Sequence, residues 1–115
     1  MPIVNLYMKK GKTKEDKRYI MNFISSSINK ATGTDFKNIF IYINETEPQN
    51  ITNEAPVVTV SWAAVPARTN EAKKQIMAEV SKKLAEFTGS DLENVVVTFT
   101  DLPLTNVAMG GIARE

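Results

Sequence analysis

The sequence contains neither cysteine nor histidine. The absence of cysteine excludes disulfide bonds and thiolate chemistry, and the absence of both residue types removes the usual ligands of zinc, copper and haem. We therefore expect no tightly bound transition metal, and any chemistry has to come from other groups.

A charge of one sign and long apolar runs are also lacking. Fourteen basic and thirteen acidic residues leave a net charge of +1, too little to attract nucleic acid or an anionic membrane surface. No run approaches the roughly 18 apolar residues of a membrane span, and no signal-type segment follows the N-terminus. The 115 residues, 43% of them hydrophobic, predict one globular, cytoplasmic domain that binds neither nucleic acid nor membrane.

What the sequence does contain is an internal repeat. Shifting the chain by 56 residues superimposes identical residues without a gap, which predicts two repeats, 1–56 and 57–115, within the single domain 1–115. The identical pairs are Thr13 and Thr69, Glu15 and Glu71, Lys17 and Lys73, Ile20 and Ile76, Met21 and Met77, Ser25 and Ser81, Thr32 and Thr88, Gly33 and Gly89, Asp35 and Asp91, Asn38 and Asn94, and Asn50 and Asn106.

The first repeat has the pattern of a strand, a helix and a strand. Residues Ile3–Met8 are rich in strand formers. Apolar residues at helical spacing predict a helix over Lys14–Ala31, with Thr13 as its N-cap and Gly33 as the left-handed residue past its end. Ile39–Ile43 is apolar without alternation, which predicts a strand buried on both faces.

The second repeat has the same pattern. It contains a predicted strand over Val57–Trp62, a helix that Thr69 caps and Gly89 ends, and a strand over Val95–Thr100. Between the repeats, Asn44–Pro56 is polar and carries two prolines, which predicts a connecting loop or a small hairpin.

Two right-handed β-α-β units predict an α+β, two-layer fold, with one four-stranded sheet and two helices on one of its faces. The other face would expose isoleucine, valine and phenylalanine side chains, more than a monomer normally shows to water. We therefore expect another subunit to cover it.

Pro2 opens the first predicted strand. Removal of Met1 would leave Pro2 with a secondary amine at the end of a strand, and a free α-amine has a pKa of about 7.7–8.0. Burial or a neighbouring cation lowers this pKa, which suits a general base at neutral pH. Many proteins begin with Met-Pro without using it, so the dipeptide alone is weak evidence.

Several segments together resemble the tautomerase superfamily, the family of 4-oxalocrotonate tautomerase and macrophage migration inhibitory factor. These are Pro2-Ile3 at the start of a strand, Gly-Lys-Thr-Lys-Glu and Ala-Arg-Thr-Asn-Glu before the two helices, and Gly110-Gly111 near the end. The chain resembles the fused form, in which two short units are joined and three chains form a trimer.

This resemblance implies the roles of individual residues. Pro2 corresponds to the catalytic base, and Arg68 to the arginine that binds the carboxylate of an enol or 2-oxo acid; Lys12 holds the same position in the first repeat. Val58 replaces the proline in the second repeat and is internal, so the resemblance allows one active amine per chain.

The departures from the family narrow the expected substrate. Phe40 and Val96 stand where many members have a second arginine, and Val65 stands where related dehalogenases have another. Met109 stands where those dehalogenases have a water-activating carboxylate, which argues against hydration and dehalogenation. A substrate with one carboxylate and a hydrophobic tail is therefore expected.

Phe99, Val107 and Met109 are candidates for the apolar wall of the substrate site, although core or trimer-interface positions explain them as well. Arg18 and Arg114 are expected to face solvent. The function expected is a cofactor-independent tautomerase that moves a proton in a small enol or 2-oxo acid. The alternatives are a non-catalytic trimeric binding or structural protein of the same fold, and a hydratase or dehalogenase. Retention of Met1 would make the Pro2 nitrogen an amide and prevent it from acting as a base.

Overall fold

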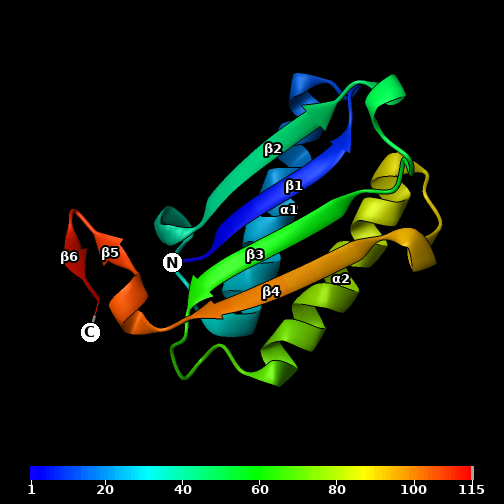
Figure 1. The fold of residues 1–115 in the computed structure, drawn as a ribbon. Helices are drawn as coiled ribbons and strands as arrows, with labels where there is room; N and C mark the ends of the chain where they lie inside the picture. The colour runs from blue at the N-terminus through cyan, green and yellow to red at the C-terminus, as the bar shows by residue number, and fades with distance from the viewer. Residues whose placement is uncertain (115) are drawn as a thin grey trace.

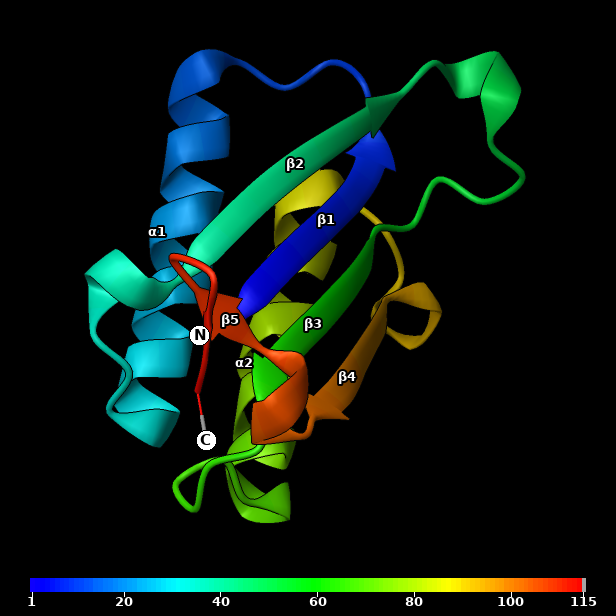
Figure 2. The same ribbon diagram turned by 60° about the vertical axis from the view of Figure 1, so that its left-hand side comes forward.

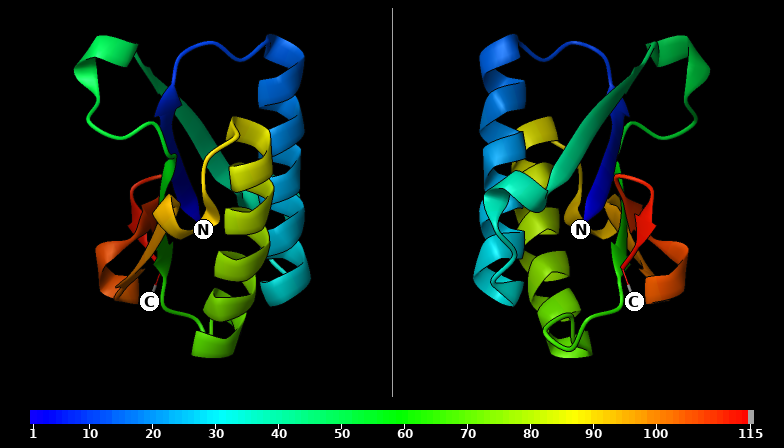
Figure 3. Two further views of the ribbon diagram at one scale, coloured as in Figure 1. Left: turned by 90° about the vertical axis from the view of Figure 1, so that its right-hand side faces the viewer. Right: turned by 90° about the vertical axis from the view of Figure 1, so that its left-hand side faces the viewer.

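The computed structural model describes residues 1–114 and has two layers, a mixed four-stranded sheet and a pair of helices that cover one of its faces (Figures 1 and 3). In chain order the main elements are β1 (Ile3–Lys9), α1 (Lys14–Thr32), β2 (Phe40–Thr46), β3 (Val57–Ala63), α2 (Asn70–Thr88) and β4 (Val96–Leu102). The short strands β5 (Ala108–Met109) and β6 (Ile112–Ala113) follow, and four single-turn 3₁₀ helices lie in the connections. The predicted α+β fold of two β-α-β units is confirmed; Glu115, the end of the predicted second repeat, lies outside the described residues.

The strand order is β2-β1-β3-β4. Each repeat contributes a parallel pair, β1 with β2 and β3 with β4, and the antiparallel pairing of β1 with β3 joins the two units. In that central pairing Val4 lies opposite Val60, its own counterpart after a shift of 56 residues. A residue paired with its own counterpart marks a local two-fold axis, so one repeat is turned half a revolution relative to the other.

The helix ends follow the predicted local signals. The Thr13 side chain accepts a hydrogen bond from the Asp16 amide in a complete capping box, and the Thr69 side chain accepts one from the Ala72 amide. Past the C-terminal ends, Gly33 and Gly89 adopt φ of 71° and 74°, a conformation that costs glycine little.

The two repeats also share an ion pair that links each helix to its following strand. Lys17 on α1 lies 2.5 Å from a carboxylate oxygen of Glu45, and Lys73 on α2 lies 2.5 Å from one of Asp101. Both partners in the second pair are 56 residues beyond those in the first. The repeat therefore extends to side-chain interactions.

The core lies between the sheet and the helices. Its buried side chains come from alternate positions of the central strands and from one face of each helix: Val4, Leu6, Met8, Ile20, Ile24, Ile28, Val58, Val60, Trp62, Ile76, Val80 and Leu84. Trp62 is completely buried, with its ring centroid 4.8 Å from that of Phe99. This packing makes Trp62 the largest fixed element at the end of β3.

The opposite face of the sheet exposes large apolar side chains in the single chain, including Ile3, Tyr7, Phe40, Tyr42 and Val96. The prediction that β2 is buried on both faces is wrong for the single chain, because both helices lie on one side of the sheet (Figure 3). The side chains of β2 alternate in burial as a result.

Two predictions about the connections need correction. β2 continues to Thr46, and residues 47–56 contain a single 3₁₀ turn, Pro48–Asn50, with no strand pairing, so the small-hairpin alternative is wrong. The β5–β6 hairpin, whose turn is Gly110-Gly111, was not predicted. No helix in residues 1–114 has the length and apolar character needed to cross a membrane.

Candidate functional site

Three segments far apart in the sequence meet at the N-terminal end of β1. The start of β1, the exit of β3 and the β5–β6 hairpin lie together at this end of the sheet (Figure 2). The antiparallel register pairs Ile3 with Ser61, and continuing it by two residues places Met1 opposite Ala63. The loop after β3, which contains Arg68, therefore begins beside the N-terminus.

A cavity of about 170 Å³ opens at this end of the molecule. It is lined by the N-terminal residue, by the segment between α1 and β2, by the loop after β3 and by the C-terminal hairpin: Met1, Thr34, Asp35, Asn38, Arg68, Met109 and Arg114. We call it the N-terminal pocket. It combines an amine, two guanidinium groups and one carboxylate.

The chain end is held firmly in this pocket. Pro2 is buried, and its carbonyl oxygen accepts a hydrogen bond of 2.9 Å from the Phe40 amide on β2. Burial, and then the guanidinium groups of Arg68 and Arg114, lowers the pKa of the Met1 amine from its ordinary 8.0 to about 6. All three causes disfavour the charged amine, so an amine here is mostly neutral at pH 7.

Arg68 is anchored on one side and free on the other. Its Nη1 atom donates a 2.7 Å hydrogen bond to the Ala63 carbonyl, and its Cζ atom lies 5.3 Å from the centroid of the Trp62 ring. Its Nε atom is buried and has no hydrogen-bond partner in residues 1–114. A buried donor without a partner costs roughly 1–3 kcal/mol, and a bound carboxylate would remove that cost.

The Trp62 ring that supports Arg68 is itself fixed. The indole nitrogen donates a 2.7 Å hydrogen bond to Asp101, whose second oxygen accepts from Lys73 at 2.5 Å. Lys73 and Trp62 hold the Asp101 carboxylate in its charged form and lower its pKa. The guanidinium thus rests on a ring with little rotational freedom.

Arg114 is a second cation at the pocket. Its backbone amide donates a 2.9 Å hydrogen bond to the Val107 carbonyl, which ties the end of the hairpin to its beginning. Burial of Arg68, with Arg114 nearby, lowers the pKa of Arg68 from its ordinary value, although arginine remains charged at neutral pH. Arg114 is exposed, as expected from the sequence, but it also lines the N-terminal pocket. The sequence gave no sign of this position because the hairpin was not predicted.

The other predicted substrate-binding residues separate into two groups. Met109 lines the N-terminal pocket with Arg68. Lys12 does not, because it follows the far end of β1 and lines a different cavity. Phe99 packs against Trp62 in the core, and Val107 is not among the residues that line the N-terminal pocket. For these three residues the expectation of a shared pocket with Arg68 is corrected within the single chain.

Thr34, Asp35 and Asn38 also line the pocket but were not singled out as site residues. The signal that could have revealed two of them was present, because Asp35 and Asn38 are identical to their counterparts in the second repeat. No group of three or more histidine, cysteine, aspartate or glutamate side chains suited to a metal ion occurs in the described part of the chain.

A repeated β-α-β protein with a chain-terminal amine beside two arginines defines a recognisable class. The family model described as Tautomerase enzyme matches residues 56–113, about half of the chain. The protein belongs to the tautomerase family. A comparison with curated proteins gives no match.

Solved structures similar to this chain have the same fold over nearly its whole length. A fused 4-OT described as an asymmetric trimer has a TM-score of 0.85 and 22% identity, over 97% of this chain and 95% of that one. Pt0534 inactivated by 2-oxo-3-pentynoate has a TM-score of 0.83 and 23% identity, with the same coverage. Malonate semialdehyde decarboxylase, described with decarboxylase and hydratase activities, has a TM-score of 0.73 and 14% identity, over 94% and 90%.

Proposed function

We propose that the protein is a cofactor-independent keto-enol tautomerase acting on a small enol or 2-oxo acid. The nitrogen of Pro2, released by removal of Met1, is its general base. The observation that carries this proposal is the position of the chain end, where the amine pKa is lowered to about 6 beside Arg68, whose buried Nε has no partner in residues 1–114. A neutral amine next to an unoccupied cationic donor suits removal of a proton from a bound carboxylic acid.

In the proposed reaction, Arg68 binds the substrate carboxylate and the Pro2 nitrogen takes a proton from the enol hydroxyl. The electrons of that O–H bond form the carbonyl, and the double bond shifts toward the conjugated carbon. Protonated Pro2 then returns the proton to that carbon, which restores the neutral amine. The negative charge on the dienolate is greatest between the two transfers, so a fixed guanidinium lowers the barrier for both.

Arg114 broadens the expected substrate class. The sequence indicated one arginine and hence one carboxylate, with Met109 favouring an apolar tail. Because Arg114 lines the same pocket, a second carboxylate on the substrate would also meet a cation. We therefore include dicarboxylic enols, such as 2-hydroxymuconate, beside an arylated enolpyruvate.

We also propose that three chains assemble with the open faces of their sheets inward. The exposed apolar residues of that face support this arrangement, since a monomer rarely leaves such a surface in water. A trimer is described for the similar fused 4-OT.

Hydration is a second candidate reaction because Asp35 brings a carboxylate to the pocket. Met109 occupies the place where the family resemblance puts the water-activating carboxylate, so Asp35 would have to take that role from another element. Hydration of an acetylenic 2-oxo acid that is lost in Asp35→Asn, with tautomerisation retained, would support this candidate. Equal hydration by the parent and by Asp35→Asn would refute it.

The experiment that tests the main proposal starts with intact-mass measurement of the N-terminus. Protein lacking Met1 should ketonise enol acids and be alkylated once per chain, at Pro2, by an acetylenic 2-oxo acid. Pro2→Ala should lose most of kcat while retaining the fold, and the exposed Pro66→Ala provides the matched control. Full activity in Pro2→Ala, or in protein that retains Met1, would refute the role of Pro2 and favour a non-catalytic binding protein.

A further inference from the structure

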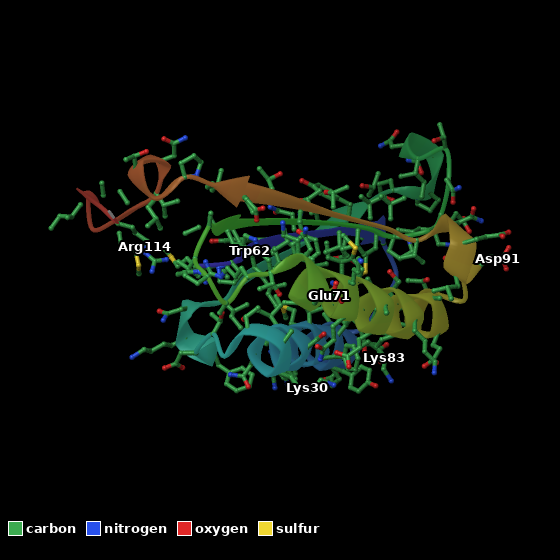
Figure 4. All side chains as sticks on the ribbon, turned by 90° about the horizontal axis from the view of Figure 1, so that it is seen from below. Lys30, Trp62, Glu71, Lys83, Asp91 and Arg114 are labelled. Atoms are coloured by element: carbon green, nitrogen blue, oxygen red, sulfur yellow. The ribbon has the colours of Figure 1, made fainter. Side chains whose placement is uncertain are left out.

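A second cavity, of about 450 Å³, lies at the opposite end of the sheet from the N-terminal pocket. It is formed by the loop between β1 and α1, the loop before β3 and the segment after α2. Figure 4 shows Asp91, from the last of these segments, at the other end of the molecule from Arg114. We call this cavity the distal pocket.

The internal repeat relates the distal pocket to the N-terminal pocket. After a shift of 56 residues, five residues that line one cavity coincide with five that line the other: Lys12 with Arg68, Asn53 with Met109, Ser90 with Thr34, Asp91 with Asp35, and Asn94 with Asn38. The local two-fold axis between Val4 and Val60 brings each set to an equivalent place on the fold. The distal pocket is therefore the structural counterpart of the site proposed above.

The distal pocket lacks the group that would make it a second tautomerase site. Val58 stands at the position of Pro2, and it is buried within β3 with its nitrogen in a peptide bond. An amide nitrogen has no basic lone pair, so this pocket cannot remove a proton in the same way. Any ligand it holds would bind without that reaction.

A cation is nevertheless retained at the equivalent position. The Lys12 ammonium lies 4.8 Å from the centroid of the Phe87 ring, and no carboxylate in residues 1–114 forms an ion pair with it. The neighbouring Lys9 and Lys10 are paired with Glu54 and Glu47, at 3.1 and 3.2 Å. Lys12 is thus the lining lysine with a charge that is open to a ligand.

The remaining wall is more polar than that of the N-terminal pocket. Asn53 replaces Met109, and its side-chain oxygen accepts a 2.9 Å hydrogen bond from the Ala55 amide, which leaves its NH₂ group available. Asn94 adds a second amide, and Asp91 makes no side-chain capping bond to its 3₁₀ helix. These groups suit the hydroxyls of a ligand better than a hydrophobic tail.

We propose that the distal pocket binds a small hydroxy acid without converting it, with the carboxylate at Lys12 and the hydroxyls at Asp91, Asn53 and Asn94. This proposal goes beyond the proposed tautomerase and uses none of its residues. It assigns the enlarged counterpart of the active pocket to recognition of a second, more polar acid.

The test titrates isotope-labelled protein with glycerate and follows amide resonances. Glycerate should shift Gly11, Gly89 and Asn94 with a single saturating curve, and Lys12→Gln should weaken that curve on the order of tenfold, as expected for loss of a charge-assisted contact. Lys12→Arg should restore most of the affinity because it keeps the charge. Lys14→Gln is the matched control, since Lys14 is close in sequence but does not line the pocket.

Propionate and glycerol separate the two parts of the proposed ligand. Propionate lacks the hydroxyls and glycerol lacks the carboxylate, so each should bind more weakly than glycerate at these amides. The proposal is overturned if glycerate causes no shifts there, if Lys12→Gln binds as the parent does, or if propionate binds as tightly as glycerate. Because the readout is binding at Gly11 and Gly89, Arg68→Gln should leave it unchanged, and a failure of the tautomerase proposal would not affect it.

Discussion

Substituting Arg68 by methionine should raise the pKa of the N-terminal amine by up to about 1 unit. The structure lowers this pKa from 8.0 to about 6, with burial as the largest cause and Arg68 as the second. The total change is about 2 units, from 8.0 − 6, so the second-largest cause accounts for at most about half of it. Methionine has a similar length without the charge, which leaves burial largely unchanged.

The expected consequence is a change in the neutral fraction of the amine. With a pKa of about 6, about 90% of the amine is neutral at pH 7, whereas with a pKa near 7 about half is neutral. The rate of amine acetylation at pH 7 should therefore fall by up to roughly twofold in Arg68→Met and converge with the parent above pH 9. The sign follows from the cation, because a positive neighbour disfavours the protonated amine and its removal favours it.

The assay is competitive acetylation across pH 5–10, followed by peptide mass spectrometry, on protein whose N-terminal residue has been established by intact mass. Arg68→Lys keeps the positive charge and should keep the low pKa, and the exposed Arg18→Met is the control for loss of a remote arginine. A parent amine with an ordinary pKa near 8 would refute the burial argument. An equal rise in Arg68→Met and Arg68→Lys would refute the electrostatic one.

Three further predictions concern the pocket, its support and the open face of the sheet. Arg114→Gln should raise KM for 2-hydroxymuconate more than for an arylated enolpyruvate, and equal changes for the two substrates in steady-state kinetics would contradict a role for Arg114 in binding a second carboxylate. Trp62→Phe removes the donor to Asp101 and should reduce the free energy of unfolding by about 2 kcal/mol, measured by urea denaturation, whereas an unchanged midpoint would show that the bond contributes little. Tyr42→Lys should reduce the mass in sedimentation equilibrium from three chains toward one, while Tyr19→Lys on the helix layer should not; a trimer in both variants would place the interface elsewhere.

The local features of this fold were readable from the sequence. Each helix begins at a threonine and ends at a glycine because capping hydrogen bonds connect residues only three or four positions apart. The repeat predicted two equivalent units for the same reason, since Thr13 and Thr69 have the same local neighbours. Pro2, Arg68 and Met109 were all expected near a substrate, and the structure brings Arg68 and Met109 together with the N-terminus.

The burial of strand faces was not determined locally. The run Ile39–Ile43 is apolar throughout, but Phe40 and Tyr42 are exposed in the single chain while Ile41 and Ile43 pack on the helices. An apolar run does not distinguish burial by the same chain from burial by another one, and the placement of both helices on one face decides which positions are covered.

The composition of the N-terminal pocket was decided by tertiary structure alone. Lys12 and Arg68 hold the same position in the two repeats, yet only Arg68 lies beside the N-terminus, because β1 and β3 are antiparallel and the two loops leave opposite ends of the sheet. Arg114 reaches Arg68 through a hairpin of two-residue strands, which are too short to produce a periodic pattern. Sequence determined the elements and their ends through neighbouring residues, whereas strand direction and long-range packing determined which cations surround the amine.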